Sequence, residues 1–465
     1  MKNPRIMLAA GASGSGKTLI TCGLLQVLVN RGLKVSSFKC GPDYIDPMFH
    51  SKVIGTKSRN LDTFFTGSEM TRWLFARNAA DCDISVMEGV MGYYDGVAGV
   101  TTKASAYDLA QTTDTPVILI VNSKGMSLSL AAYIKGFLSY RENSHIKGVI
   151  FNQMSPMLYP RMKEAVEKEL SVSVLGYVPK VEDCVIESRH LGLMLPEEIV
   201  GLKERLQKLA GILENKLDID GILALADSAP DMDHLTDPRE LNPDYSYHAG
   251  TSLRIGVSSD EAFCFFYEDN FELLREMGAT LVPFSPLHDT KLPENLDGLL
   301  LYGGYPELYC RQLSENSSMR EDIRKFLNLG MPCMAECGGF MYLHEQMEDM
   351  EGHFYPQVGV LPGNVFRTPK LSRFGYITLD SKENVSAFCA DNLKGIPAHE
   401  FHYFDSENCG TDFSAKKPES RRGWECLHAE ERRLLGFPHF YYYGQPALPA
   451  AFLKACETYK GERHS

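Results

Sequence analysis

The stretch Arg5–Thr18, read as RIMLAA followed by GASGSGKT, decides how the first part of the chain folds. Its last eight residues fit the pattern G-x-x-x-x-G-K-[ST]. The apolar run Arg5–Ala10 predicts a buried strand, and Leu19–Arg31 predicts a helix that Gly32 ends. In a strand–loop–helix of this kind, backbone N–H groups and the helix N-terminus converge on phosphate oxygens. The sequence therefore predicts a nucleoside triphosphate site, with ATP as the nucleotide.

Two side chains of this loop are expected to contact different parts of the bound Mg-nucleotide. Lys17 is expected to reach the β- and γ-phosphates, and Thr18 to hold Mg²⁺. The residues predicted to bind the nucleotide here are Gly11, Ser13, Gly14, Ser15, Gly16, Lys17 and Thr18.

Composition narrows the class of protein. The chain has 465 residues, 44% of them hydrophobic and 23% charged, which predicts two globular domains. Its 47 basic and 60 acidic residues give a net charge of −13, which argues against a nucleic-acid partner. No apolar run is long enough for a membrane helix, and Met1–Pro4 leads directly into the first strand, so we expect no membrane partner, no signal peptide and a cytoplasmic protein. The 12 cysteines form no C-x-x-C, which favours free thiols.

Apolar runs alternate with helical patterns, which predicts an α/β fold with a largely parallel sheet. The expected strands of the first domain are Val35–Lys39, Ile84–Glu88, Pro116–Asn122, Lys147–Met154 and Ser173–Pro179. We expect an ATP-binding domain over residues 1–216, a linker over 217–253 that is rich in turn formers, and a second α/β domain over 254–465.

The second domain begins a new series of strands. These are expected at Arg254–Ser258, Ala279–Phe284, Asp297–Tyr302 and Pro332–Glu336, followed by short β pieces at Gln357–Val360, Tyr376–Leu379 and His399–Tyr403 and a helix near Leu448–Tyr459.

Acidic residues follow two of the strands in the first domain. Glu88 ends a predicted strand, at the sheet edge where ligands of open parallel sheets bind, so we expect it to hold Mg²⁺. The segment Lys39–Pro47, KCGPDYIDP, brings Asp43 and Asp46 to the same edge. We expect Asp43 to be the metal ligand and the catalytic acid, because Asp46 precedes a proline and can simply shape a turn.

Four motifs carry a resemblance to a known family. GASGSGKT, KCGPDYIDP, MEGVMGYYDG and ESRHLGL resemble the cobyrinic acid a,c-diamide synthases, which are ATP- and glutamine-dependent enzymes of corrinoid synthesis. The first domain is similar to the dethiobiotin-synthetase branch of P-loop proteins. The resemblance implies that ATP phosphorylates the substrate's a- and c-acetate carboxylates and that ammonia attacks the acyl phosphates.

The same resemblance suggests further residues for the first site. It places Asn152 and Pro179 against adenine, although Asn152 also fits as a turn residue at a strand end. It assigns Tyr44, Arg189 and His190 to the acidic tetrapyrrole substrate.

A cysteine lies at a predicted sharp turn in the second domain. Pro332–Met341, PCMAECGGFM, reads as a strand, a turn at Cys337 and a helix start that stabilises a thiolate. Oxyanion donors are expected from the backbone of Gly304, Tyr305 and Gly338, and the base is expected to be His439.

These residues resemble the triad type of glutamine amidotransferase, in which the cysteine attacks glutamine and releases ammonia. There are two departures from the pattern. Ala335 stands where many such domains have glycine, and Tyr441 stands where many have the glutamate of the triad. The third member is therefore absent or supplied from elsewhere, and His399 and His402 are read as structural or substrate-facing.

The resemblance extends over nearly the whole chain and implies cobyrinic acid, glutamine and ATP as substrates of a monomer or homodimer. Hydrogenobyrinate and nickel-sirohydrochlorin a,c-diamide synthases share this chemistry and stay open as alternatives. A partitioning-type P-loop ATPase is the alternative from another class. It is disfavoured because Ala12 and Ser13 stand where such switches usually carry a second lysine, and because a switch needs no Cys337.

Overall fold

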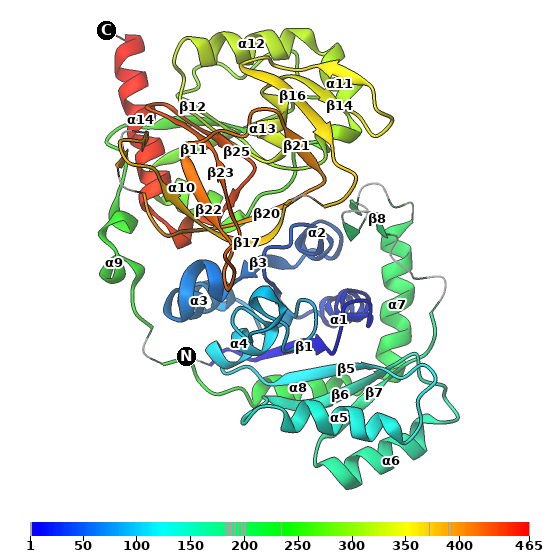
Figure 1. Ribbon diagram of the computed structural model, residues 1–465. Helices are drawn as coiled ribbons and strands as arrows, with labels where there is room; N and C mark the ends of the chain where they lie inside the picture. The colour runs from blue at the N-terminus through cyan, green and yellow to red at the C-terminus, as the bar shows by residue number, and fades with distance from the viewer. Residues whose placement is uncertain are drawn as a thin grey trace. The chain divides into compact units, whose positions relative to one another are not determined.

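The computed structural model describes residues 2–181, 184, 188–189, 192–193, 195–196, 199, 201–233, 235–371, 373–388, 390–391 and 393–464. The chain divides into two compact units, Met1–Asp237 and Pro238–Ser465 (Figure 1). Both are built on a mainly parallel sheet with helices, so the predicted α/β fold is confirmed.

The first unit contains a seven-stranded sheet in the order β3-β2-β4-β1-β5-β6-β7, with every neighbouring pair parallel. Its strands are β1 (Arg5–Ala10), β2 (Val35–Cys40), β3 (Lys57–Leu61), β4 (Ile84–Glu88), β5 (Val117–Asn122), β6 (Ile146–Asn152) and β7 (Ser173–Val178). The central strands are apolar and almost fully buried, as expected for a sheet covered on both faces. Because β1 lies between β4 and β5, the phosphate loop that follows β1 is next to the loop that follows β4.

Helices connect or follow these strands. They are α1 (Lys17–Asn30), α2 (Ile45–Met48), α3 (Thr63–Ala79), α4 (Ala106–Thr112), α5 (Ser129–Ser139), α6 (Tyr159–Leu170) and α7 (Leu202–Lys216). Helices α1 and α7 pack side by side (Figure 1). Gly23 permits this close approach, because a Cβ at that position would lie 2.5 Å from Cδ1 of Leu213.

The stretch expected to be a linker begins with a helix. Helix α8 (Ile219–Asp227) belongs to the first unit and packs against β1 and β7. The side chain of Asp218 caps it by accepting a hydrogen bond of 2.8 Å from the N–H of Gly221. Short helical turns follow in the second unit at α9 (Pro238–Leu241) and Pro243–Ser246.

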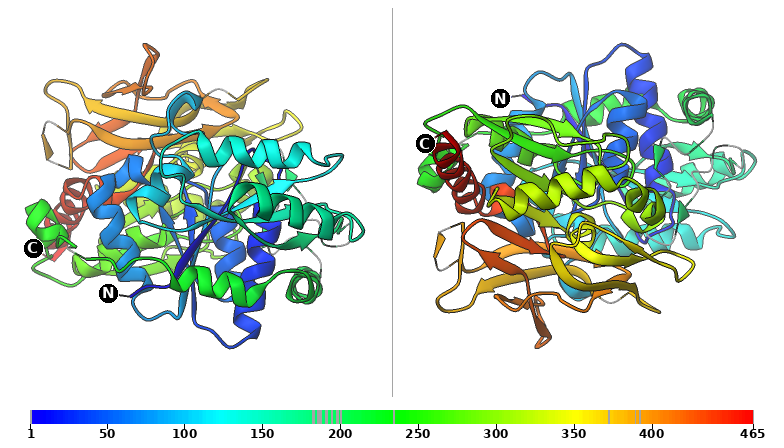
Figure 2. Two further views of the ribbon diagram at one scale, coloured as in Figure 1. Left: turned by 90° about the horizontal axis from the view of Figure 1, so that it is seen from below. Right: turned by 90° about the horizontal axis from the view of Figure 1, so that it is seen from above.

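The second unit has a six-stranded sheet in the order β11-β10-β12-β13-β25-β24, parallel except for the pair of its last two strands. Its strands are β10 (Leu253–Ser258), β11 (Ala279–Phe284), β12 (Gly298–Leu301), β13 (Cys333–Glu336), β24 (His428–Glu430) and β25 (Arg433–Gly436). Its helices are α10 (Glu268–Glu276), α11 (Cys310–Glu315), α12 (Ser317–Asn328), α13 (Gly338–Tyr342) and α14 (Ala447–His464). Helix α14, red in both views of Figure 2, packs against β10.

Smaller sheets complete this unit. One contains β15 (Phe354–Pro356), β14 (His344–Glu348), β16 (Leu361–Arg367) and β21 (Phe404–Ser406), and the other β23 (Gly423–Cys426), β22 (Phe413–Lys416), β17 (Arg373–Ser381), β20 (Ile396–His402) and β26 (His439–Phe440). The predicted strand at Gln357–Val360 is wrong, because these residues turn between β15 and β16. None of the helices within the described ranges combines the length and apolar character needed to cross a bilayer.

His344 is a fully buried histidine in the core of the second unit. Its Nδ1 lies 3.0 Å from the carbonyl of Phe340, and its Nε2 lies 2.7 Å from Oγ of Ser406. Burial lowers its pKa from 6.5 to about 4, so the folded protein holds this imidazole neutral at pH 7.

This buried histidine predicts a stability that falls with acid. Between pH 6.5 and about 4 the unfolded chain binds a proton at this position that the folded chain does not, so lowering the pH favours unfolding. From pH 7 to pH 5 we expect this group to remove about 1–2 kcal/mol of the free energy of unfolding. His344→Gln should flatten this dependence in urea titrations at the two pH values, and an equal loss in both proteins would contradict the assignment.

Candidate active sites

The phosphate loop lies between β1 and α1, as predicted. Gly14 and Gly16 have φ values of 74° and 91°, a left-handed conformation that favours glycine. A Cβ on Gly16 would lie 2.3 Å from Nδ2 of Asn152, which donates a hydrogen bond of 2.9 Å to the carbonyl of Ser15. Asn152, the last residue of β6, therefore braces the phosphate loop. The adenine contact expected for it stays a prediction.

The ammonium group of Lys17 connects the phosphate loop to the loop after β4. Its Nζ donates to the carbonyl of Ala12 at 3.1 Å and to that of Met91 at 2.5 Å. The pKa of Lys17 is lowered to about 8. Burial is the largest cause, and the nearby positive charge of Lys39 is the second. A phosphate oxygen would supply the counter-charge that this amine largely lacks.

A buried charged cluster lies beside the loop, at the carboxyl ends of β2 and β4. Thr18 Oγ1 donates to Glu88 Oε1 at 2.7 Å and lies 3.3 Å from Asp46 Oδ2. Lys39 Nζ donates to Asp46 Oδ2 and, at 2.9 Å, to Glu88 Oε1. His50 Nε2 lies 3.3 Å from Glu88 Oε2. The two carboxylates and the lysine are almost completely buried, so each depends on the others for its charge balance.

The two acids of the cluster, Glu88 and Asp46, have pKa values shifted in opposite directions. Burial would raise the pKa of Glu88, but Lys39 and His50 outweigh it and hold that pKa well below its usual value. Burial and the charges of Asp43 and Glu88 raise the pKa of Asp46, and Lys39 only partly offsets them. Carboxylate and hydroxyl oxygens are the ligands that Mg²⁺ prefers, so Thr18, Asp46 and Glu88 form a donor set that fits this ion.

Asp43, the acid expected to hold the metal, lies at the edge of this cluster. Its Oδ1 accepts hydrogen bonds from the N–H groups of Ile45 at 2.8 Å and Asp46 at 3.2 Å, at the start of the short helix α2. Its Oδ2 stays 4.0 Å from Lys39 Nζ, and 35% of its side chain is exposed. The geometry therefore favours Asp46 over Asp43 as the acid beside Thr18 and Glu88. The proline after Asp46 favours the opposite choice when the sequence is considered alone.

The remaining residues assigned to the first site are placed less completely. Pro179 follows β7 and lines a cavity of about 710 Å³ together with Lys180 and one face of α7. Tyr44 is largely buried, with 9% of its surface exposed, at the start of α2. Arg189 lies in the short strand β8 (Ser188–Arg189), and His190 lies outside the described residues.

In the second unit, Cys337 forms the sharp turn that the sequence predicts. It joins β13 to α13 with φ 46° and ψ −106°, a strained conformation for a residue with a side chain. Gly339 allows the turn to pack, because a Cβ there would lie 2.1 Å from the carbonyl oxygen of Leu301. Strain of this kind at a strand-to-helix turn is typical of a nucleophile elbow.

The glycines after β12 bring the histidine and the cysteine together. A Cβ on Gly303 would lie 2.6 Å from Cε1 of His439 and 3.4 Å from Cβ of Cys337, so both side chains flank this residue. A Cβ on Gly338 would lie 3.1 Å from the backbone nitrogen of Gly304. Gly304 and Gly338 are therefore neighbours beside Cys337, and the oxyanion role expected for their N–H groups stays a prediction.

The expectation for the backbone of Tyr305 needs correction. Its N–H donates to the carbonyl of Ala262 at 3.0 Å, so it is already engaged within the fold. Tyr305 supports the loop rather than an oxyanion, because a hydrogen bond used this way is not available to substrate.

Burial raises the pKa of the Cys337 thiol well above its usual range, and the charge of Glu307 adds to the effect. The thiol is therefore protonated at neutral pH and needs a base to become a nucleophile. His439, at the start of β26 and 2% exposed, is the imidazole placed beside it.

His399 and His402 differ in their surroundings. Strand β20 pairs His399 directly with His439, and the two ring centroids are 6.4 Å apart. His402 stacks on Phe437 at 4.0 Å between centroids and lies 3.2 Å from Oε2 of the buried Glu400. Of the two alternatives for His402, structural or substrate-facing, these contacts favour the structural one.

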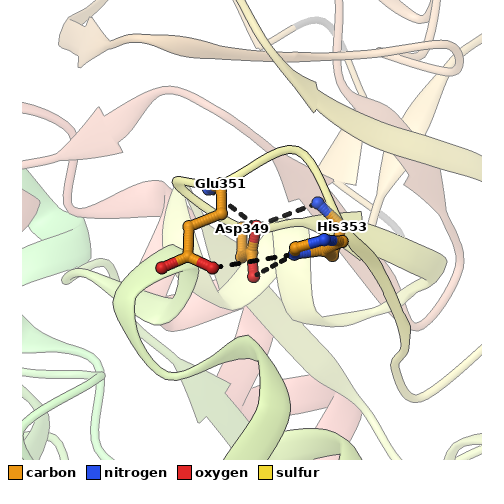
Figure 3. Close-up of side chains that lie close together, drawn as sticks. All are labelled: Asp349, Glu351 and His353. Atoms are coloured by element: carbon orange, nitrogen blue, oxygen red, sulfur yellow. Dashed lines mark hydrogen bonds and ion pairs between the residues drawn. The ribbon is translucent and has the colours of Figure 1, made fainter.

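A group of possible metal ligands lies in a turn of the second unit. Figure 3 shows Asp349, Glu351 and His353 between β14 and β15. Asp349 Oδ1 accepts hydrogen bonds from the backbone N–H groups of Glu351 at 2.8 Å and His353 at 2.9 Å. Formation of the turn accounts for this exposed cluster.

A phosphate loop beside a buried acid cluster and a cysteine elbow beside a histidine define the class of this protein. It is a nucleotide-dependent enzyme with a glutamine amidotransferase unit. Two family models agree: residues 6–193 match the CobQ/CobB/MinD/ParA nucleotide binding domain, and residues 254–430 match the CobB/CobQ-like glutamine amidotransferase domain.

Three relatives cover almost the whole chain, and each is named cobyrinate a,c-diamide synthase. The protein of Caldanaerobacter subterraneus subsp. tengcongensis is 38% identical over 98% of this chain and 99% of its own length. That of Clostridium acetobutylicum is 40% identical over 94% and 97%, and that of Priestia megaterium 36% identical over 100% and 99%. The chain belongs to the cobyrinate a,c-diamide synthase family and is a glutamine-dependent amidotransferase ligase.

The cluster geometry predicts different outcomes for the two aspartates. Asp46→Asn removes an oxygen charge beside Thr18 and Glu88, so the affinity for Mg²⁺ should fall at least about 100-fold. Asp43→Asn should change it much less, because the amide oxygen of asparagine can accept the same two backbone hydrogen bonds. Titration of the ATP-dependent rate with Mg²⁺, with ammonia as nitrogen donor, measures both. The reverse ranking would restore Asp43 as the metal ligand.

Proposed function

We propose that this enzyme amidates the a- and c-acetate carboxylates of cobyrinic acid, using ATP and ammonia released from glutamine. The observation that carries the proposal is the presence, in one chain, of a phosphate loop with a buried oxygen cluster and of a strained cysteine elbow. The names of the full-length relatives support the choice of substrate.

In the first unit, the substrate carboxylate attacks the γ-phosphate of ATP and becomes an acyl phosphate. Backbone N–H groups of Gly11–Gly16 and the ammonium of Lys17 hold the phosphates and offset their charge. Thr18, Asp46 and Glu88 would hold Mg²⁺, which supplies further charge neutralisation when bound. Lys39 keeps Glu88 ionised for that task. Ammonia then displaces phosphate and leaves the amide.

In the second unit, glutamine is the source of the ammonia. The proton of the Cys337 thiol passes to His439, and the sulfur attacks the side-chain amide carbon of glutamine. The N–H groups of Gly304 and Gly338 stabilise the oxyanion, and the proton returns to the departing nitrogen as ammonia. Water hydrolyses the thioester to glutamate and restores the thiol.

The related diamide synthases differ in the ring that is amidated. An assay of ATP and glutamine with cobyrinic acid, hydrogenobyrinic acid and nickel-sirohydrochlorin, read by the mass change for each replaced hydroxyl, distinguishes them. We expect cobyrinic acid to have the highest kcat/KM. Preference for either other ring would reassign the substrate without altering the chemistry.

A partitioning-type ATPase switch predicts a different result. Such a protein would hydrolyse ATP without amidating any ring and without consuming glutamine. The cysteine elbow disfavours this alternative, because a switch has no use for a strained nucleophile beside a histidine.

Loss of the nucleophile should abolish glutamine-dependent amide formation and leave ammonia-dependent amide formation intact. Cys337→Ala should form no amide from glutamine but should still form it from high ammonium at alkaline pH, where free NH₃ reaches the acyl phosphate. His439→Ala should behave in the same way, with a fall of at least about 1,000-fold in the glutamine-dependent rate. Amide formation measured by mass spectrometry with each nitrogen donor tests this.

Cys409→Ala is the matched control, because this half-buried thiol of the second unit lies outside the elbow. It should keep both activities. Glutamine-dependent synthesis by Cys337→Ala would remove the amidotransferase role from this cysteine, and loss of ammonia-dependent synthesis by the folded variant would contradict the division of labour.

A further inference from the structure

The position that many triads give to a glutamate is occupied by Tyr441 in this chain. Its hydroxyl donates a hydrogen bond of 2.7 Å to Oδ2 of the buried Asp269. Tyrosine cannot replace a carboxylate as the acceptor that orients a histidine at neutral pH, because it has no negative charge. The carboxylate must therefore come from another position, if the triad has one.

A buried carboxylate lies beside His439 on the strand that carries the nucleophile. Glu336 is the last residue of β13 and immediately precedes Cys337. Its Oε2 is 3.5 Å from Nδ1 of His439, and both side chains are only 3% exposed. The N–H of Phe440 points to the same oxygen, also at 3.5 Å. Two elements, β13 and β26, thus place the acid and the imidazole in contact.

The strained turn explains how adjacent residues can serve one histidine from different sides. Cys337 leaves the strand with a positive φ, and its Cβ flanks Gly303, as does Cε1 of His439. The carboxylate of Glu336 approaches the same imidazole at Nδ1. A proton held on Nδ1 leaves the lone pair of Nε2 to act as the base.

We propose that Glu336 is the third member of the amidotransferase triad, a positioning residue that fixes the tautomer of His439 and stabilises its protonated form. The proposal rests on the assignment of Cys337 as nucleophile and His439 as base. It gives this chain the order Glu336, Cys337, His439, with the acid supplied by the residue before the nucleophile.

The surrounding charges agree with this role. Burial raises the pKa of Glu336, and His439 acts in the opposite direction by favouring the ionised acid. Oε1 of Glu336 is buried and has no hydrogen-bond partner among the described residues, so the charge of this group depends on the imidazole. From β20, burial and the charge of His439 hold the pKa of His399 well below its usual range, so His399 adds no competing positive charge. Glu307 and Glu400 are the other acids that act on Cys337.

Glu336→Gln tests the proposal, because it keeps the size of the side chain and removes the charge. We expect the glutamine-dependent rate to fall at least about 100-fold, while the ammonia-dependent rate stays within about threefold of the wild type. The second readout is the pH dependence of Cys337 alkylation by iodoacetamide, followed by the mass of the Cys337 peptide. Loss of the carboxylate disfavours the imidazolium, so the pH at which the profile reports proton loss from His439 should fall by about one unit.

Two further variants make the result decisive. Glu336→Asp should recover part of the glutamine-dependent rate. Its rates and its alkylation profile are used for the test if Glu336→Gln fails to fold. Asp297→Asn is the matched control: it changes an equally buried acid that precedes β12, at the opposite end of that strand from Gly303. Its ratio of glutamine- to ammonia-dependent rates should equal that of the wild type.

An unchanged alkylation profile in Glu336→Gln would overturn the proposal, even if the rate fell, because a merely structural role would leave the profile unmoved. A glutamine-dependent rate within threefold of the wild type would overturn it as well. Failure of the underlying assignment is seen separately, as glutamine-dependent activity in Cys337→Ala.

Discussion

The buried ammonium group of Lys39 is the interaction on which the first site depends. It holds Asp46 and Glu88 together beside Thr18, in a place where neither carboxylate could stay charged alone. Removing one partner from a buried ionic group typically costs about 3–5 kcal/mol, because the other charges stay behind without compensation. The oxygens of this buried cluster are of the kind that Mg²⁺ prefers as ligands.

Both chemical centres follow from one property of parallel sheets. Strands that run in the same direction bring their carboxyl ends to a common edge, where loops can carry reactive groups. In the first unit this edge gathers the ends of β1, β2 and β4, and in the second it gathers the ends of β12 and β13. Each unit therefore has its candidate site at the edge of its own sheet, which is why we expect mutations to remove glutamine hydrolysis and carboxylate activation independently.

Much of this arrangement could be predicted from the sequence. The phosphate loop, Glu88 and the elbow at Cys337 depend on local patterns, and the structure places them as expected. Strand β3 was not predicted because KSRNL has few apolar residues and no clear alternation. The roles proposed for Lys39, Asp46 and Glu336 rest on contacts between residues far apart in the sequence, which local patterns do not show. A lysine at the end of a buried strand was a usable signal, because such a charge needs acidic partners.

In the reaction proposed for this enzyme, the first unit activates a carboxylate by phosphorylation. The most direct test uses cobyrinic acid labelled with ¹⁸O in its acetate carboxylates, incubated with ATP and ammonium. If an acyl phosphate forms, ammonia expels phosphate that keeps one carboxylate oxygen, so each amide made should place one ¹⁸O in inorganic phosphate. Label in AMP, or amide formation without label in phosphate, would contradict the account.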